Sequence, residues 1–137
     1  MTTVAWDGKT LATDSQQTTT FIMTAGVEKL MRIPDGPAFA SCGKYSDRVS
    51  LARWLSGASP EKPKIEEGFL AVVIDGGEAI LYDNNLVPME IRPPFACGSG
   101  QEFAMGAMLA GADARQAVKI AIELDPNSGG DVQAIDF

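Results

Sequence analysis

The chain has 137 residues and is 45% hydrophobic, which is enough for one core and too short for two, so we expect a single domain over residues 1–137. With 11 Lys and Arg against 18 Asp and Glu, its net charge of -7 argues against binding nucleic-acid phosphates or anionic lipid. The absence of histidine excludes Ser-His-Asp and Cys-His catalysis and removes the commonest zinc ligand.

The first third of the chain predicts β-hairpins. Asp7-Gly8 is a dipeptide that tight primed turns prefer, and Pro-Asp-Gly at residues 34–36 is a second turn signal. Alternation of polar and apolar residues, or β-rich composition, marks the flanking segments as strands. The predicted strands are residues 4–6, 11–13, 21–23, 28–33 and 38–42.

The rest of the chain predicts helices and further strands. Ser99 with Glu102, and Asp113 with Gln116, have the spacing of a capping box. Residues 59–64 are rich in proline and charge and form a loop rather than a domain boundary. The predicted helices start near Ser46, Ser99 and Asp113, and the predicted strands are residues 69–74, 79–82, 88–91 and 132–135. This order suits helices outside two packed antiparallel sheets.

Two cysteines, Cys42 and Cys97, are too few for a disulfide framework, and both lie among small apolar residues, so we expect reduced core thiols. No apolar run approaches the roughly 20 residues of a membrane span, and the first residues lack the pattern of a signal peptide. We therefore expect a cytoplasmic protein without membrane or nucleic-acid partners.

The first residues of the chain carry groups suited to catalysis. Removal of Met1 would leave Thr2 with a free amine beside its own hydroxyl. An α-amino group has a pKa of about 7.7 to 8.0, so it can accept the hydroxyl proton near neutral pH. One residue would then supply both nucleophile and general base.

Five motifs, in order and at compatible spacings, are similar to those of the proteasome β-subunit and HslV-type peptidase family, the N-terminal-nucleophile threonine peptidases. They are TT at residues 2–3, ATDS at 12–15, VEKL at 27–30, ACGSG at 96–100 and DPNSGG at 125–130. The resemblance spans nearly the whole chain. It implies an α+β fold, a four-layer αββα sandwich of two packed antiparallel sheets with outer helices.

The resemblance also implies the site. Thr2 would be the nucleophile, Lys29 would lie near its hydroxyl and Asp14 would hold Lys29 charged and oriented. Three further residues would hydrogen-bond around the Thr2 amine and a proton-relaying water: Ser99, Asp125 and Ser128. Taken singly, each has a structural reading, for example Lys29 as the solvent-facing residue of a strand and Ser99 as a helix cap.

Other positions follow the family less closely. Residues 40–43 read Ala-Ser-Cys-Gly where the family commonly has Ala-Gly, and we assign the oxyanion-binding backbone N–H to Ser41. Val27 and Met31 would line an apolar pocket for the substrate side chain. Carbonyls of Ile122, Asp125 and Ser128 would bind a monovalent cation such as Na⁺; peptide hydrolysis itself would need no cofactor.

Between residues 57 and 69 the chain has a loop where the family usually has a second helix, so one helical layer is expected to be reduced.

The sequence thus predicts a threonine-type endopeptidase that cleaves unfolded polypeptides through an acyl ester on Thr2. By resemblance it would form a six- or seven-fold homo-oligomeric ring, alone or stacked, with an ATP-dependent unfoldase as partner. Two alternatives remain open. One is an N-terminal-nucleophile amidase acting on small amides, and the other is a catalytically silent ring or scaffold protein with the same fold.

Overall fold

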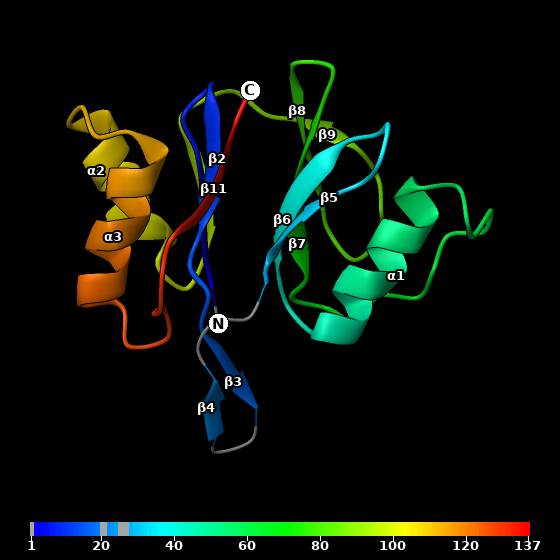
Figure 1. Ribbon diagram of the computed structural model, residues 1–137, viewed down its shortest axis with the longest axis horizontal. Helices are drawn as coiled ribbons and strands as arrows, with labels where there is room; N and C mark the ends of the chain where they lie inside the picture. Colours follow the sequence, from blue (N-terminus) through cyan, green and yellow to red (C-terminus); the bar gives the residue numbers. More distant parts are fainter. Residues whose placement is uncertain (1, 20–21, 25–27) are drawn as a thin grey trace.

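The computed structural model describes residues 2–19, 22–24 and 28–137, and only the backbone of residues 17–19 and 22–24. Two antiparallel sheets pack face to face, and helices cover both outer faces (Figure 1). The predicted four-layer αββα sandwich is confirmed.

The first sheet contains β1 (Thr3–Trp6), β2 (Thr10–Thr13), β10 (Phe95–Gly98) and β11 (Gln133–Asp136). Its order is β10-β1-β2-β11, and every neighbouring pair is antiparallel. The connection from β1 to β2 is the predicted turn, in which the Asp7 carboxylate accepts hydrogen bonds from the N–H groups of Lys9 and Thr10. Gly8 has a φ of 98°, which side chains rarely allow. We did not predict β10, because alanine, cysteine and glycine carry no strand signal.

The second sheet contains β5 (Leu30–Arg32), β6 (Ala38–Cys42), β7 (Leu70–Asp75), β8 (Glu78–Tyr82) and β9 (Met89–Glu90). Its strands run in sequence order, antiparallel throughout. A separate hairpin pairs β3 (Gln17–Thr19) with β4 (Ile22–Thr24) and projects from the end of the sandwich (Figure 1). The strand predicted over residues 21–23 is therefore only partly described.

The helices are α1 (Tyr45–Leu55), α2 (Gln101–Leu109) and α3 (Ala114–Leu124). The capping box of Asp113 and Gln116 at α3 is confirmed. The predicted start near Ser46 agrees with α1, whose N-cap is Lys44, but the predicted cap at Ser99 is wrong because Gly100 holds that position. Neither helix has a side-chain cap. The Ser99 hydroxyl bonds to other groups instead, as described below.

Side-chain size determines how closely the layers approach. Val4, Trp6 and Leu11 fill the space between the sheets with residues of β6 and β7. The opposite face of the same strands carries Ala5 and Ala12, both fully buried. Because successive strand residues point to opposite faces, the alanines let α2 and α3 pack directly on this sheet.

The other helical layer is reduced, as predicted. In the described chain α1 alone covers the second sheet, and Leu51 is its fully buried contact. Loop residues Ile65, Phe69 and Leu86 pack into the same cluster. These loops fill space that a second helix would otherwise occupy.

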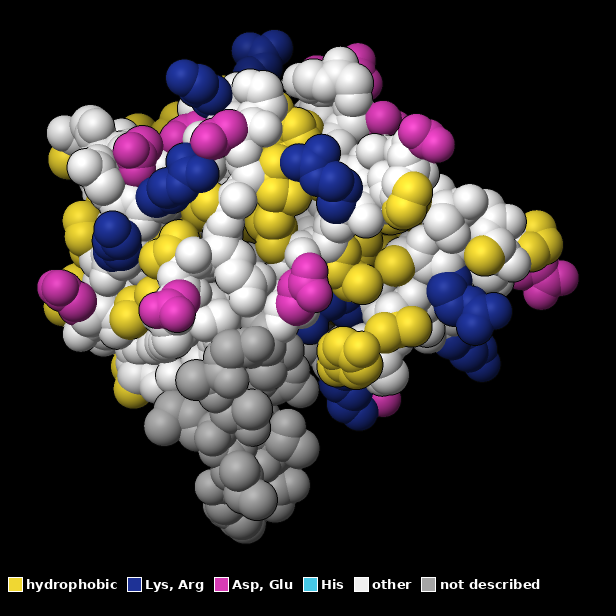
Figure 2. Space-filling view, in the orientation of Figure 1, with side chains coloured by type: hydrophobic (Ala, Val, Ile, Leu, Met, Phe, Trp, Pro, Cys, Tyr) yellow, Lys and Arg dark blue, Asp and Glu magenta, His cyan; other side chains and the backbone are white. Residues whose placement is uncertain are grey.

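Two further observations concern the surface and the thiols. Basic and acidic side chains are interspersed on the face shown in Figure 2. No helix in the described part of the chain is long and apolar enough to cross a membrane. Cys42 and Cys97 are buried and free, as predicted.

Replacing Leu86 by alanine tests whether the loop acts as core. Leu86 is 0% exposed, so Leu86→Ala should lower the free energy of unfolding by about 2–5 kcal/mol. The neighbouring Val87 is 62% exposed, and Val87→Ala should change stability by less than about 0.5 kcal/mol. Urea denaturation measures both, and equal effects would mean that the loop is not part of the core.

Candidate active site

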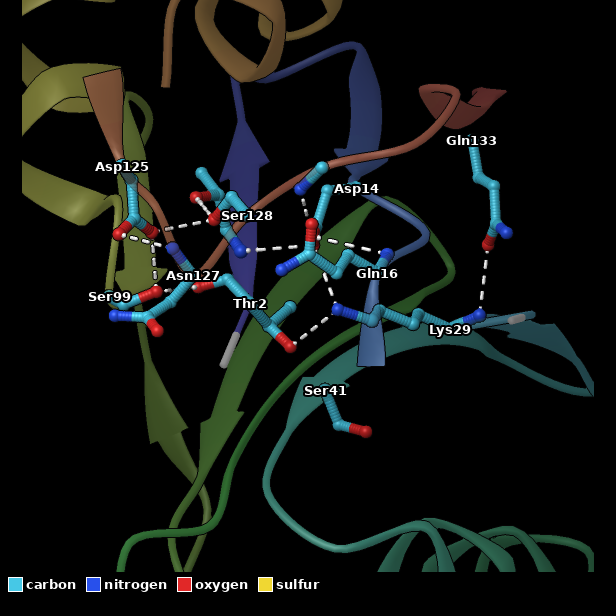
Figure 3. Close-up of polar contacts among 12 residues, drawn as sticks. Thr2, Asp14, Gln16, Lys29, Ser41, Ser99, Asp125, Asn127, Ser128 and Gln133 are labelled. Atoms are coloured by element: carbon cyan, nitrogen blue, oxygen red, sulfur yellow. Dashed lines mark hydrogen bonds and ion pairs between the residues drawn. The ribbon is translucent and has the colours of Figure 1, made fainter. Parts of the chain in front are cut away.

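Thr2 and Lys29 meet between the two sheets. Thr2 directly precedes β1 and Lys29 directly precedes β5, so each sheet supplies one of them. The Lys29 ammonium donates a 2.8 Å hydrogen bond to Thr2 Oγ1 (Figure 3). Thr2 is 3% exposed and Lys29 is 1% exposed, so the reading of Lys29 as a solvent-facing strand residue does not hold.

Asp14 is fully buried and uses both carboxylate oxygens. Its Oδ1 accepts hydrogen bonds from Lys29 Nζ at 3.0 Å and from the Thr3 N–H at 3.1 Å. Its Oδ2 accepts from the N–H groups of Gly129 at 3.0 Å and Gln16 at 3.4 Å. These four hydrogen bonds replace the hydration that the buried carboxylate has lost. Asp14 thereby joins the first residues, the end of β2 and the loop after α3.

The electrostatic environment of Lys29 is set mainly by burial. Burial lowers the pKa of the Lys29 ammonium, and attraction to Asp14 only partly opposes that effect. The buried guanidinium of Arg48 lowers the pKa of Lys29 further by repulsion. A cation held in a dry environment stabilises negative charge on a nearby oxygen strongly. The nearest such oxygen is the hydroxyl of Thr2.

Ser99, Asp125 and Ser128 form a second network on the other side of Thr2. Both serine hydroxyls donate to Asp125 Oδ2, at 2.5 Å from Ser99 and 2.7 Å from Ser128. Ser99 Oγ also lies 3.4 Å from the carbonyl oxygen of Thr2, and Ser128 Oγ lies 2.7 Å from Thr3 Oγ1. The three predicted residues therefore lie together, and the two serines contact Thr2 and Thr3.

The Asp125 carboxylate is held in its ionised form. Burial raises its pKa, but hydrogen bonds from Ser99, Ser128 and the Asn127 N–H more than offset burial and hold the pKa below its ordinary value. The network thus keeps a negative charge close to the backbone of Thr2.

Two residues that the sequence did not single out support the segment that carries Lys29. The side-chain oxygen of Gln133 accepts hydrogen bonds from the N–H groups of Lys29 at 2.9 Å and Leu30 at 3.2 Å. Arg48 donates from Nη1 to the Glu28 carbonyl at 3.4 Å. No local pattern marks either residue, since Gln133 lies on a short strand and Arg48 on a helix face.

A cavity of about 320 Å³ opens beside Thr2. Its lining includes Thr2, Cys42, Gly43, Leu70, Ser99 and Glu102. These residues come from both sheets and from α2. A substrate group in this cavity would therefore lie next to the Thr2 hydroxyl.

The assignment of the Ser41 backbone N–H to the oxyanion site stays a prediction. The Ser41 side chain is fully buried, accepts a 3.0 Å hydrogen bond from Arg48 Nε and points away from Thr2 (Figure 3). The cavity wall contains the next two residues, Cys42 and Gly43. Gly43 has a φ of 122°, and an added Cβ would lie 2.9 Å from the Phe69 ring, so both conformation and space require glycine there.

The other predicted positions are less informative. Val27 lies outside the described residues. Met31 is half-buried and packs against the cluster under α1, and it is not part of the described lining of the cavity.

For the predicted cation site, Ile122 packs against the cluster under α2 and α3, and the Asp125 carbonyl accepts the Ser128 N–H at 3.1 Å. Among the described residues no three His, Cys, Asp or Glu side chains group as a metal site. The carbonyl site for a monovalent cation stays a prediction.

Comparison with known proteins supports the fold. No protein-family model and no curated protein sequence matches the chain. Among solved structures, HslV from Trypanosoma brucei superposes with a TM-score of 0.74 at 24% identity, covering 100% of both chains. BPH from Thiobacillus denitrificans gives a TM-score of 0.73 at 18% identity, covering 99% of this chain and 96% of BPH.

BPH in complex with epoxomicin gives a TM-score of 0.75 at 20% identity, covering 99% and 97% of the two chains. The fold implied by the sequence motifs is therefore shared over nearly the full length of all these chains.

Breaking the buried ion pair tests its role in stability. Asp14→Asn leaves the Lys29 ammonium without its carboxylate and should cost about 3–5 kcal/mol of unfolding free energy. Adding Lys29→Met to that variant should recover most of the loss, because the ammonium that lost its carboxylate is then removed. Chemical denaturation measures both, with the exposed Asp131→Asn as control. A double variant no more stable than Asp14→Asn would contradict this account.

Acid stability tests the Asp125 network. The folded pKa of Asp125 is lower than the ordinary value of 3.8, so its contribution to stability is present above that value. The contribution is lost as pH falls through the lower, folded pKa. On acidification from neutral pH to pH about 3, Asp125→Asn should therefore lose less unfolding free energy than the unaltered chain loses. The control variant, Asp75→Asn at an exposed position, should lose as much unfolding free energy on acidification as the unaltered chain. Equal losses in the two variants would mean that the network does not hold Asp125 ionised.

Proposed function

We propose that this chain is a threonine-type endopeptidase of the proteasome β-subunit and HslV-type family, with Thr2 as its nucleophile. The 2.8 Å contact between Lys29 Nζ and Thr2 Oγ1, buried between two sheets, is the observation that carries the proposal. Its likeness in fold to HslV and to BPH, which has been solved with epoxomicin, supports the same chemistry.

The reaction begins with proton transfer within Thr2. Once Met1 has been removed, the free amine of Thr2 takes the proton from Oγ1, directly or through a water. The oxygen then forms a bond with a substrate peptide carbonyl carbon. Lys29 stabilises charge on the attacking oxygen and disfavours protonation of the neighbouring amine, which keeps that amine available as base.

We propose the backbone N–H of Gly43 as a donor to the oxyanion, as an alternative to the predicted N–H of Ser41. Gly43 and Thr2 line one cavity, and a backbone donor needs no particular side chain. The tetrahedral intermediate then loses its C–N bond, and the leaving amine takes the proton held by the Thr2 amine. Water, deprotonated by the same amine, breaks the resulting acyl ester and restores Thr2.

Ser99, Asp125 and Ser128 orient the first residue in this proposal. Their hydrogen bonds reach the Thr2 carbonyl and the Thr3 hydroxyl, so they restrict rotation at the nucleophile. The ionised Asp125 also favours a nearby positive charge, as forms on the Thr2 amine when it accepts the proton.

We propose unfolded polypeptides as substrates, cleaved inside a six- or seven-fold homo-oligomeric ring in the cytoplasm. Exposed apolar side chains on the outer helices support contacts between copies; Leu109 of α2 is 72% exposed and Leu124 of α3 is 57% exposed. An ATP-dependent unfoldase would deliver folded substrates. Native mass spectrometry tests the ring through its mass.

Reaction with epoxomicin tests the chemistry. An epoxyketone presents two electrophilic carbons, one for the hydroxyl and one for the amine of an N-terminal threonine. Intact-mass spectrometry should show loss of Met1 and one covalent adduct, and fluorogenic peptides should be hydrolysed. Thr2→Ala should lose the adduct and more than about 1,000-fold of the hydrolysis rate, whereas Thr2→Ser should keep both the hydroxyl and the adduct.

The contradicting outcomes are separable. Retained Met1 with no adduct and no hydrolysis would favour a silent scaffold. An adduct with hydrolysis of small amides but not of peptides would favour an amidase. Peptide hydrolysis that survives Thr2→Ala would reject Thr2 as the nucleophile.

A further inference from the structure

Lys29 directly precedes strand β5. β5 begins one residue later, at Leu30, which pairs with Ala40 of β6. The N–H groups of Lys29 and Leu30 both donate to the single oxygen Oε1 of Gln133, at 2.9 and 3.2 Å (Figure 3). Gln133 belongs to β11 in the opposite sheet, so its amide bridges the two sheets at this position.

Arg48 binds the carbonyl of the peptide group whose N–H, on Lys29, donates to Gln133. Its Nη1 donates to the Glu28 carbonyl at 3.4 Å, and its Nε donates to Ser41 Oγ on β6 at 3.0 Å. The guanidinium also lies over the Tyr45 ring, 5.9 Å from the centroid. Arg48 is 2% exposed, a position that a charged group seldom occupies without a specific role.

We propose that Gln133 and Arg48 are positioning residues for Lys29, which hold its backbone so that the ammonium reaches Thr2 Oγ1. Gln133 holds the N–H groups that follow the Glu28 carbonyl, and Arg48 holds that carbonyl. This inference rests on the proposed function, because it assigns the two residues a part in the same reaction.

The chemistry of each side chain fits this task. A neutral amide oxygen accepts two N–H groups without adding charge near the Lys29–Asp14 pair. The forked guanidinium can donate in two directions at once, to a backbone carbonyl and to a hydroxyl. A long lysine side chain depends on its Cα for placement, and a misplacement of about 1 Å can cost about 100-fold in rate.

Arg48 has an electrostatic consequence as well. Among the described residues, the charged or titratable groups that act most strongly on Lys29 are Asp14 at the end of β2, Arg48 on α1 and Cys42 on β6. Of these only Arg48 is a cation, and it lowers the pKa of Lys29. Removing its charge should therefore raise the pKa of Lys29 and keep the ammonium protonated to higher pH.

The experiment compares adduct formation with epoxomicin in matched variants. Gln133→Leu, which removes the acceptor at similar size, should slow adduct formation by about 10- to 100-fold. It should also lower thermal stability, because two backbone N–H groups lose their acceptor. Gln133→Glu keeps an oxygen acceptor and should react much faster than Gln133→Leu. Arg48→Met should shift the alkaline limb of the pH–rate profile to higher pH, and Arg48→Lys, which keeps the charge, should not.

Failure of the inference and failure of the proposed function look different. If the unaltered chain reacts and Gln133→Leu reacts equally fast, the positioning role is wrong and the peptidase proposal stands. If the unaltered chain does not react, the peptidase proposal fails. Amide hydrogen exchange then tests whether Gln133 holds the backbone of Lys29 and Leu30. Faster exchange at Lys29 and Leu30 in Gln133→Leu, reversed in Gln133→Glu, would support it, and unchanged exchange would overturn it.

Discussion

The site depends on one buried charge pair between the sheets, Lys29 with Asp14. An ammonium and a carboxylate that are 1% and 0% exposed lose their hydration and must recover it from protein groups. The structure supplies three further backbone N–H donors to Asp14, and Lys29 has the hydroxyl of Thr2 as an additional partner. Because these groups come from separate segments, the pair requires all of them to be in place together.

That requirement links the fold to the chemistry. The first sheet brings Thr2 and Asp14, and the second sheet brings Lys29, so the interface between the sheets is also the place where the Thr2 hydroxyl meets the Lys29 ammonium. Side-chain layers of ordinary core residues, such as Val4 and Val72, maintain this spacing. A hydroxyl held between packed layers loses little orientation to thermal motion, which is what an attacking group needs.

The outer faces of the two sheets are covered in different ways. On the first sheet, small residues such as Ala5 and Ala12 admit two helices at close range. On the second, one helix and the loops around Ile65 and Leu86 cover the strands. The face of the sandwich that bears the loops thus keeps its core with less regular structure, since burial of apolar area does not require a helix.

The amino-acid sequence by itself determined the hairpin turns and the capping box at Asp113, because turn chemistry and cap spacing are local properties. The αββα layers and the candidate set Thr2, Asp14, Lys29, Ser99, Asp125 and Ser128 came from the family that the order of its five motifs resembles. Short-range spacing also predicted a helix cap at Ser99, wrongly, since Gly100 holds that position. Only the tertiary structure decided that the cavity wall is Cys42 and Gly43 and that Gln133 and Arg48 hold the Lys29 segment. Gln133 is 104 residues from Lys29 along the chain. Such contacts arise from the packing of one sheet on another, and no periodicity within either segment encodes them.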